Sequence, residues 1–281
     1  MLSYRHAFHA GNHADVLKHL ILVQMARHLA QKDKAFWYID THAGAGSYAL
    51  DSPAATKLGE HRDGIGRLWL RKDLPPAVAD YVDLVRRANP DGRLKIYPGS
   101  PTFALWTLRA HDRLRLCELH GREVLRLREN FRDCDRQVLV DEVDGFAALK
   151  GLLPPPPRRG LVLIDPPYEE RRDYERVVLA LKDSLQRFPG GSYLLWYPLL
   201  SKLEAHELPS RLKRLSAARW LHVSLRVRTP AADGFGMHGS GLFVINPPWT
   251  LQATLQESLP WLRQVLAVDA GAAFTLEGEA P

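Results

Sequence analysis

The chain has few of the features that build disulfide frameworks, membrane spans or secretory signals. Of its 281 residues only two are cysteines, Cys117 and Cys134, and they do not form a Cys-x-x-Cys pair. Apolar runs are short: residues 20–23 (LILV) end at Gln24, whereas a helix needs about 20 apolar residues to span a bilayer. No apolar signal core follows the first ten residues. We therefore expect no secretory signal and no membrane partner, and a cytoplasmic location.

The net charge of +6 fits a polyanionic partner, although many cytosolic proteins are mildly basic and the charge alone identifies none. Arginine is concentrated in two stretches, residues 109–136 and residues 211–228. Because a guanidinium group can bind phosphate through two parallel hydrogen bonds, both stretches are candidate contacts with nucleic acid. We expect a monomer that binds RNA.

Apolar runs alternate with helical patterns along most of the chain. A helix is predicted over residues 14–31, with Asn12 as its N-cap and Leu17, Leu20, Ile21 and Met25 on its apolar face. Seven runs have the length of strands: residues 35–40, 114–118, 137–141, 161–165, 192–197, 221–227 and 241–246. Continuous apolar strands separated by helices predict an α/β fold with a mostly parallel seven-stranded sheet that is covered on both faces.

One segment interrupts this alternation. Residues 52–98 contain two helical patterns, at 63–71 and 77–88, with prolines between them. We interpret 52–98 as a small helical inserted subdomain. Residues 1–51 and 99–281 would then form the core, with the N-terminal segment 1–13 facing substrate and cofactor.

The strongest chemical signal is Asp165-Pro166-Pro167-Tyr168, which follows the run 161–164 (LVLI). Such a tetrad would lie at the carboxyl edge of the sheet, where open α/β sheets bind their ligands. An exocyclic aromatic amine is a poor nucleophile because its lone pair is delocalised into the ring. The Asp165 carboxylate and the Pro166 carbonyl could accept its two hydrogens and free the lone pair, while Tyr168 stacks on the base. The alternative is a proline turn in which Asp165 only caps the next helix.

A second tetrad, Asn246-Pro247-Pro248-Trp249, also follows an apolar run. Only 32 residues remain after it, enough for a helix and a tail but not for three more strands. We interpret this tetrad as a structural strand terminator whose Trp249 packs against the body of the protein. Asp165, on the fourth strand, is the predicted catalytic residue.

The glycine-rich turn at residues 40–46 (DTHAGAG) predicts a nucleotide-like cofactor. Gly44, Gly46 and Ala49 also fit the looser Gly-x-Gly-x-x-Ala pattern of dinucleotide-binding dehydrogenases. Residues 51–53 (DSP), however, interrupt any helix that could bind a pyrophosphate, which favours S-adenosylmethionine. Glu118, at the end of the second strand, suits the ribose hydroxyls in either case. Asp144-Gly145 could contact the adenine of the cofactor, or Asp144 could merely cap a helix.

The N-terminal stretch is rich in histidine. His9 and His13 are four residues apart, but no third ligand accompanies them, and we expect no metal site. Tyr4, Arg5 and His6 fit nucleic-acid contacts better, since they offer an aromatic ring for stacking and a cation for phosphate.

Long motifs give the whole chain a specific resemblance. They are residues 1–6 (MLSYRH), 8–19 (FHAGNHADVLKH), 40–46 (DTHAGAG), 97–101 (YPGSP), 159–160 (RG), 165–168 (DPPY), 195–198 (LWYP) and 246–249 (NPPW). In these the chain resembles the bacterial large-subunit (23S) ribosomal RNA adenine-N6 methyltransferase family, RlmJ-type. The resemblance implies a Rossmann-like S-adenosyl-L-methionine methyltransferase core with an inserted helical subdomain.

The resemblance also implies roles for residues. The implied cofactor pocket contains Lys18, His19, His42, Gly44, Ser100, Glu118, Asp144, Gly145 and Asp165. Lys18 is a candidate partner for the cofactor carboxylate, Asp165 is the implied catalytic acceptor and Tyr4 is an implied substrate contact. Two alternatives stay open: methylation of a DNA adenine or a protein glutamine by the same chemistry, and a non-catalytic RNA-binding protein on the same scaffold.

Overall fold

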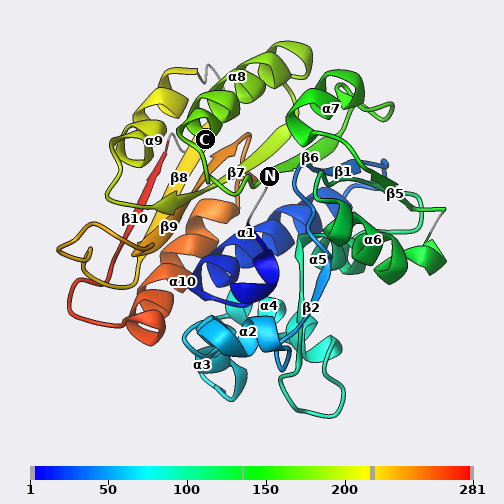
Figure 1. Ribbon diagram of the computed structural model, residues 1–281. Coiled ribbons are helices and arrows are strands. Elements are labelled where there is room, and N and C mark those ends of the chain that lie inside the picture. Colours follow the sequence, from blue (N-terminus) through cyan, green and yellow to red (C-terminus); the bar gives the residue numbers. More distant parts are fainter. Residues whose placement is uncertain (1–3, 135, 216–218, 279–281) are drawn as a thin grey trace.

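The computed structural model describes residues 4–134, 136–215 and 219–278, and its centre is a large sheet with helices on both faces (Figure 1). The eight strands of this sheet lie in the order β10-β8-β9-β7-β6-β1-β4-β5. Their bounds are β1 (Trp37–Asp40), β4 (Arg113–Cys117), β5 (Val138–Asp141), β6 (Gly160–Ile164), β7 (Ser192–Leu199), β8 (Trp220–Arg226), β9 (Gly239–Ile245) and β10 (Ala273–Gly278).

The sheet has a parallel part and an antiparallel part. β7, β6, β1, β4 and β5 run in one direction, and β9, β8 and β10 continue the sheet as antiparallel strands. The predicted α/β fold with a mostly parallel sheet is confirmed, but the predicted number of seven strands is wrong. The eighth strand is β10, which lies in residues that the sequence pattern assigns to a tail. As a half-exposed edge strand paired only with β8, β10 carries a weak apolar signal.

Two hydrophobic clusters fill the space on either side of the sheet. Residues of α1 (His13–Ala30), α4 (Pro76–Arg87), α5 (Ser100–Thr107) and α10 (Leu251–Leu266) belong to the first cluster. Residues of α7 (Gly145–Leu152), α8 (Arg171–Arg187) and α9 (Leu203–Leu215) belong to the second. Alternate residues of β6 enter the two clusters, so the strand is apolar throughout because both of its faces are covered. Within the described residues, no helix combines the length and the apolar character that a membrane span needs.

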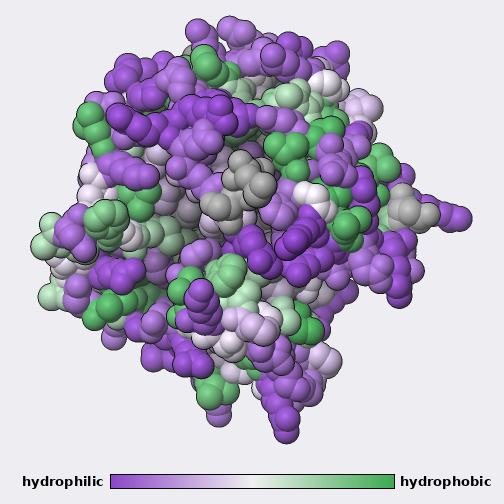
Figure 2. All heavy atoms as spheres, in the orientation of Figure 1, coloured by the Kyte–Doolittle hydropathy of each residue, from purple (hydrophilic) through white to green (hydrophobic). Residues whose placement is uncertain are grey.

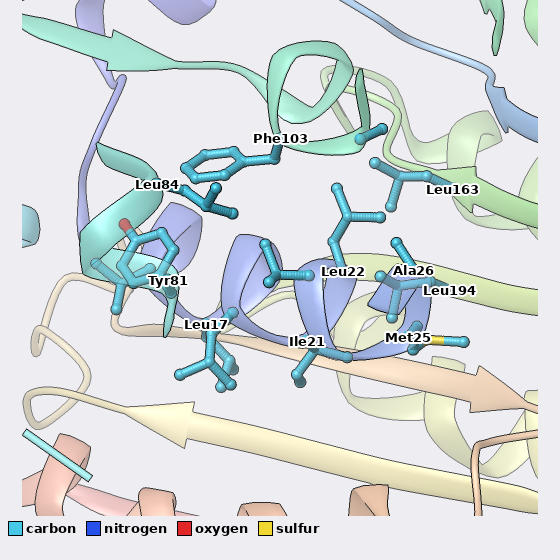
Figure 3. Packing of buried hydrophobic residues seen from close by; sticks show 14 of the residues in the cluster. Leu17, Ile21, Leu22, Met25, Ala26, Tyr81, Leu84, Phe103, Leu163 and Leu194 are labelled. Atoms are coloured by element: carbon cyan, nitrogen blue, oxygen red, sulfur yellow. The ribbon is translucent and has the colours of Figure 1, made fainter. Parts of the chain in front are cut away.

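Helix α1 is the most enclosed helix near the site. The side chain of Asn12 accepts hydrogen bonds from the backbone N–H groups of Ala14 and Asp15, which confirms the predicted N-cap. The helix is buried on nearly all sides rather than on one face, because α4, α5, α10 and the sheet surround it. Figure 3 shows its apolar residues packed between Tyr81 and Phe103 on one side and Leu163 and Leu194 on the other. Polar residues in the first turns of α1 are therefore buried as well.

Residues 53–98 form short helices and one strand of a two-stranded antiparallel sheet. These elements are α2 (Pro53–Leu58), the 3-10 turn η2 (Glu60–Arg62), α3 (Ile65–Trp69), α4 and β3 (Ile96–Pro98), and β3 pairs with β2 (Ser47–Ala49). Ile65, Leu68 and Tyr81 belong to the same hydrophobic cluster as α1. The segment thus shares its core with the rest of the molecule. The remaining elements are η1 (His6–Phe8), α6 (Gly121–Asn130) and η3 (Arg132–Cys134).

Candidate active site

The carboxyl ends of four neighbouring parallel strands open into one cavity of about 730 Å³. A cavity of this size can enclose a ligand as large as a nucleoside derivative. Its walls include the segments that directly follow β1, β4, β5 and β6, namely residues 41–44, 118–120, 144–146 and 165–170. Parallel pairing brings these segments together, because all four strands end at the same edge of the sheet.

The glycine-rich turn after β1 is bound to the end of β4. Gly44 has a φ of +60°, and a Cβ atom there would lie 2.2 Å from the hydroxyl oxygen of Tyr48, so the turn requires glycine. The Gly44 N–H donates to Oε2 of Glu118 at 2.8 Å, and the N–H of His120 donates to Oε1 at 2.7 Å. Burial raises the pKa of Glu118 above its ordinary value. Glu118 is therefore held in one orientation in the cavity wall.

Asp144 begins helix α7 at the next strand end. Its Oδ1 accepts hydrogen bonds from the N–H groups of Phe146 at 2.9 Å and Ala147 at 3.3 Å, and its Oδ2 pairs with Arg176. A Cβ atom on Gly145 would lie 1.9 Å from the carbonyl oxygen of Thr41, so only glycine fits between the two strand ends. The helix-cap alternative for Asp144 is thus confirmed, and its contact with a cofactor adenine stays a prediction.

The side chain of His42 lies in the cavity wall opposite α7. Its ring meets Phe146 edge to face, with centroids 5.0 Å apart. Burial lowers the pKa of His42 to about 4, although Asp165 and Asp144 oppose the shift. His42 is therefore a neutral imidazole at physiological pH.

Two predicted cofactor residues, Ser100 and His19, are hydrogen-bonded to buried polar side chains behind the cavity wall. Ser100 and Tyr38 both donate hydroxyl hydrogen bonds to Oδ2 of Asp40, each at 2.7 Å. Asp40 is fully buried, and this burial raises its pKa to about 6 against the effect of the two hydroxyls. His19 is hydrogen-bonded through Nδ1 to the Tyr97 hydroxyl at 2.8 Å, and burial lowers its pKa. Ser100 and His19, both predicted to bind the cofactor, do line the cavity, but the side chain of each already has a hydrogen-bond partner within the protein.

Lys18 connects the predicted catalytic carboxylate to helix α1. Its ammonium nitrogen lies 2.6 Å from Oδ2 of Asp165 and 3.0 Å from Oδ1 of Asp15. Burial alone would lower the pKa of Lys18, but the two carboxylates outweigh it and raise the pKa above its ordinary value. Since an ammonium group has three donors, two are engaged here and one is left for a ligand.

Asp15 was not identified from the sequence. Its Oδ2 accepts hydrogen bonds from the Gly11 N–H at 2.8 Å and from Nε2 of His6 at 2.9 Å. Tyr4 contacts Nδ1 of the same histidine through its hydroxyl at 2.8 Å. A chain of polar contacts therefore runs from Tyr4 through His6, Asp15 and Lys18 to Asp165. The available signal was the three-residue spacing of Asp15 and Lys18 at the start of a predicted helix.

The three predicted substrate contacts do not all reach the cavity. Tyr4 and His6 line it, and Tyr4 stacks on His9 with ring centroids 5.5 Å apart. Arg5 lies outside the lining, with its guanidinium over the ring of Phe8. His9 is hydrogen-bonded to Glu60, and the described residues contain no cluster of three His, Cys, Asp or Glu side chains that could hold a metal ion.

Tyr168 lines the cavity but offers little surface to a ligand. Its side chain belongs to the second hydrophobic cluster, it is only 3% exposed, and its hydroxyl donates to the carbonyl oxygen of Trp196 at 2.8 Å. Its φ is +52°, as the sharp turn after β6 requires. Trp196, which also lines the cavity, was not predicted as a site residue and lies beside Lys18. It offers a second aromatic surface next to Asp165.

Comparison with known proteins identifies the family. The family described as "Ribosomal RNA large subunit methyltransferase D, RlmJ" matches residues 33–276. This chain belongs to that family. It is similar to two proteins named "Ribosomal RNA large subunit methyltransferase J": 45% identical over 282 residues to the one from Haemophilus influenzae (100% of both chains), and 46% identical over 271 residues to the one from Escherichia coli K12 (96% of both chains). A crystal structure of a Legionella pneumophila protein is also similar, with 35% identity, a TM-score of 0.89 and coverage of 96% of this chain and 98% of that one.

The predicted family and its Rossmann-like methyltransferase fold are thus confirmed. Within this fold the second tetrad cannot share the site, because β9 runs antiparallel to β7 and Ile245 pairs with Tyr193 near the start of β7. Asn246 consequently lies at the edge opposite Asp165, where its amide donates to the carbonyls of Pro189 and Gly191. As predicted, the second tetrad terminates a strand, because β9 ends directly before Asn246. The predicted packing of Trp249 is wrong, however, since this side chain is 72% exposed.

The arginine-rich stretches are less available to phosphate than their composition suggests. Five of the eight arginines between residues 109 and 136 form ion pairs within the chain: Arg109, Arg115, Arg126, Arg128 and Arg132. In the second stretch, Arg211 pairs with Glu175 and Lys213 pairs with Glu277. Much of the local positive charge is therefore compensated by acidic residues of the chain itself.

Proposed function

We propose that this methyltransferase transfers a methyl group to the exocyclic N6 amine of an adenine in large-subunit (23S) ribosomal RNA. The observation that carries the proposal is the position of Asp165-Pro166, which ends a parallel strand at the wall of the cavity. Both relatives named above are ribosomal RNA large subunit methyltransferases, which supports the RNA class of the substrate. We further propose a monomeric enzyme in the cytoplasm.

S-adenosyl-L-methionine is the cofactor, and the cavity fits it. A strand, β2, and not a helix N-terminus follows the glycine-rich turn, so the turn offers no pyrophosphate site. We propose that Glu118 binds the ribose hydroxyls and that the segment 144–146 contacts the adenine ring, while Lys18 retains one donor for a carboxylate. His19, His42, Gly44 and Ser100 complete the proposed cofactor pocket. When bound, the cofactor supplies an electrophilic methyl group.

The chain's own residues would activate the amine. The Asp165 carboxylate and the Pro166 carbonyl accept hydrogen bonds from the two amine hydrogens, which draws the nitrogen toward tetrahedral geometry and frees its lone pair. Lys18 fixes the direction of the Asp165 carboxylate through the 2.6 Å contact. As positive charge develops on the amine, the Asp165 carboxylate stabilises it. Tyr168 and Trp196 bound the space beside the base.

A three-substrate assay tests the proposal. Large-subunit ribosomal RNA, DNA of matched sequence and a glutamine peptide are each incubated with enzyme and S-adenosylmethionine, and the products are identified by mass spectrometry. We expect N6-methyladenine in the RNA only. Preferential methylation of the DNA or the peptide would show that the proposed RNA substrate is wrong, although methyl transfer from S-adenosylmethionine would still be supported. Absence of transfer to all three would support a non-catalytic RNA-binding protein.

A further inference from the structure

The loop between β8 and β9 presents an aromatic side chain to solvent at the edge of the sheet that holds the active site. Gly239, at the start of β9, pairs with Arg226, the last residue of β8, and with Leu199, the last residue of β7. The loop that joins β8 to β9 therefore leaves the sheet beyond the carboxyl end of β7. In Figure 1 it projects past the ends of β8 and β9 at the left of the view. Phe235, near its tip, is 81% exposed.

Hydrogen bonds fix the base of the loop, and two glycines turn the chain at its tip. The Val227 N–H donates to the carbonyl of His238 at 2.9 Å, and the Thr229 N–H donates to the carboxylate of Asp269 at 2.9 Å. At the tip, Phe235 lies between Gly234 and Gly236, whose φ values are +72° and +84°. Glycine adopts this left-handed conformation without steric cost, so the chain can turn on both sides of the phenylalanine. The turn is held by hydrogen bonds from the Gly234 N–H to the Ala231 carbonyl at 2.9 Å and from the Phe235 N–H to Oδ1 of Asp233 at 3.0 Å.

The base of this loop is part of the active-site cavity. Val227, Arg228, Gly236 and Met237 line the same cavity as Asp165. Phe235 therefore stands at the rim, one residue from the wall. Arg228 is exposed, and its guanidinium is bonded to the carbonyl oxygen of Met237, which holds a positive charge beside Phe235.

We propose that Phe235 is a wedge that enters the RNA base stack at the position vacated by the target adenine. This inference depends on the proposed function, since an adenine whose N6 amine reaches Asp165 must leave its stack. The gap that remains is flanked by two flat apolar base surfaces, and a phenylalanine ring can fill it by stacking on them. Arg228 would bind the RNA phosphates next to the gap.

Among the described residues, Phe235 is the most exposed aromatic side chain. Figure 2 shows a face that is largely hydrophilic, with apolar residues in small separate groups. Other exposed large side chains line the cavity, namely Tyr4, Leu58, Leu119 and Val268, whereas Leu70 and Trp249 do not. Trp249 is a useful control because it is aromatic and exposed but lies at the opposite edge of the sheet.

The test compares two RNAs that differ only in whether the methylated adenine is base-paired. In one the adenine faces uridine, and in the other it faces an abasic position. We expect Phe235→Ala to slow single-turnover methylation of the paired RNA by about 10- to 100-fold, the range that loss of one base–aromatic stack gives. The unpaired RNA, in which less stacking must be broken, should be methylated nearly as fast as by the unmodified enzyme.

Two further variants and two further measurements distinguish a wedge from a general loss of activity. Phe235→Trp should restore methylation of the paired RNA, and Trp249→Ala should behave like the unmodified enzyme on both. With 2-aminopurine in place of the target adenine, Phe235→Ala should reduce the fluorescence increase that reports unstacking. The affinity for S-adenosylhomocysteine, measured by calorimetry, should not change.

The outcomes distinguish this inference from the function on which it depends. If the unmodified enzyme methylates both RNAs and Phe235→Ala slows neither, or slows both equally, the wedge is refuted while the proposed function stands. If the unmodified enzyme methylates neither these RNAs nor ribosomal RNA, the proposed function fails and the wedge fails with it.

Discussion

Replacing Lys18 by methionine should destabilise the protein markedly. The lysine side chain is 6% exposed and its ammonium contacts two carboxylates, those of Asp15 and Asp165. Methionine preserves most of the apolar stem but removes the charge. Asp15, whose side chain is only 2% exposed, then remains as a buried carboxylate without its lysine partner.

The size of the effect follows from the partners that remain. Breaking a buried ion pair by removing one partner typically costs about 3–5 kcal/mol. Asp15 keeps its hydrogen bonds from Gly11 and His6, and Asp165 lies at the cavity, where water can solvate it. We therefore expect the lower end, about 3 kcal/mol of unfolding free energy. For a chain of this size, that lowers the melting temperature by roughly 6–12 °C.

Thermal and urea unfolding of four proteins would measure this effect: the unmodified chain, Lys18→Met, Asp15→Asn and the double variant. The double variant should be more stable than the sum of the single effects predicts, by about 1–3 kcal/mol, because it leaves no deeply buried charge without a partner. Asp165 also loses Lys18, but water can solvate it at the cavity. Lys202→Met, at an exposed position, is the matched control. The reasoning would be refuted if Lys18→Met melted at the same temperature as the unmodified chain. It would also be refuted if the two single changes in unfolding free energy were strictly additive in the double variant.

Three further predictions concern the cavity. Asp165→Asn should keep the fold, because Lys18 retains its contact with Asp15, but it should slow methyl transfer by about 10²- to 10³-fold. Asn246→Ala in a folded protein should leave methyl transfer intact. The opposite result in a radioactive transfer assay would show that the wrong tetrad was chosen. Glu118→Ala should weaken S-adenosylhomocysteine binding in calorimetry by about 10- to 100-fold, the loss of a hydrogen bond to a charged group; unchanged affinity would remove Glu118 from the pocket. Because the pKa of His42 is lowered to about 4 from 6.5, its contribution to stability is present at neutral pH and is lost as the pH falls from about 6.5 toward 4. From pH 7 to pH 5 the free energy of unfolding, measured with urea, should therefore fall by about 2 kcal/mol more for the unmodified protein than for His42→Asn. Parallel pH profiles of the two proteins would contradict this.

The sequence predicted those parts of the site that depend only on strand order. Gly44, Glu118, Asp144 and Asp165 each follow an apolar run, and the ends of parallel strands must meet at one edge of the sheet. The four positions could therefore be brought together without knowing any side-chain contact. The helix-cap role of Asn12 could be predicted for a similar reason, because it involves only the neighbouring residues of the chain.

Contacts between distant residues could not be predicted in this way. Some partners of the arginine-rich stretches lie far away in sequence, as with Arg115 and Asp141 or Lys213 and Glu277. Others lie only three positions away, and the charge count of the stretches overlooked them: these are the pairs of Arg109, Arg126 and Arg132. Asp15 was missed because a carboxylate in the first turn of a helix is ordinarily explained by the helix dipole. Only the burial of α1 by elements from distant parts of the chain makes this carboxylate a partner of Lys18, which contacts the proposed catalytic residue Asp165.

The two proline tetrads show where the limit lies in physical terms. Both follow a buried strand, but the residue with a φ of +52° is the last of the first tetrad, Tyr168, and the first of the second, Asn246. The similar sequences of the two tetrads do not reveal this difference. What separates them is direction: β6 runs parallel to β1 and ends at the cavity, whereas β9 runs antiparallel to β7 and ends at the opposite edge. Counting the strands that remain in the chain led to Asp165, which lies at the cavity, whereas Asn246 lies at the opposite edge because it follows a strand that runs antiparallel to β7. The catalytic role of Asp165 itself stays a prediction.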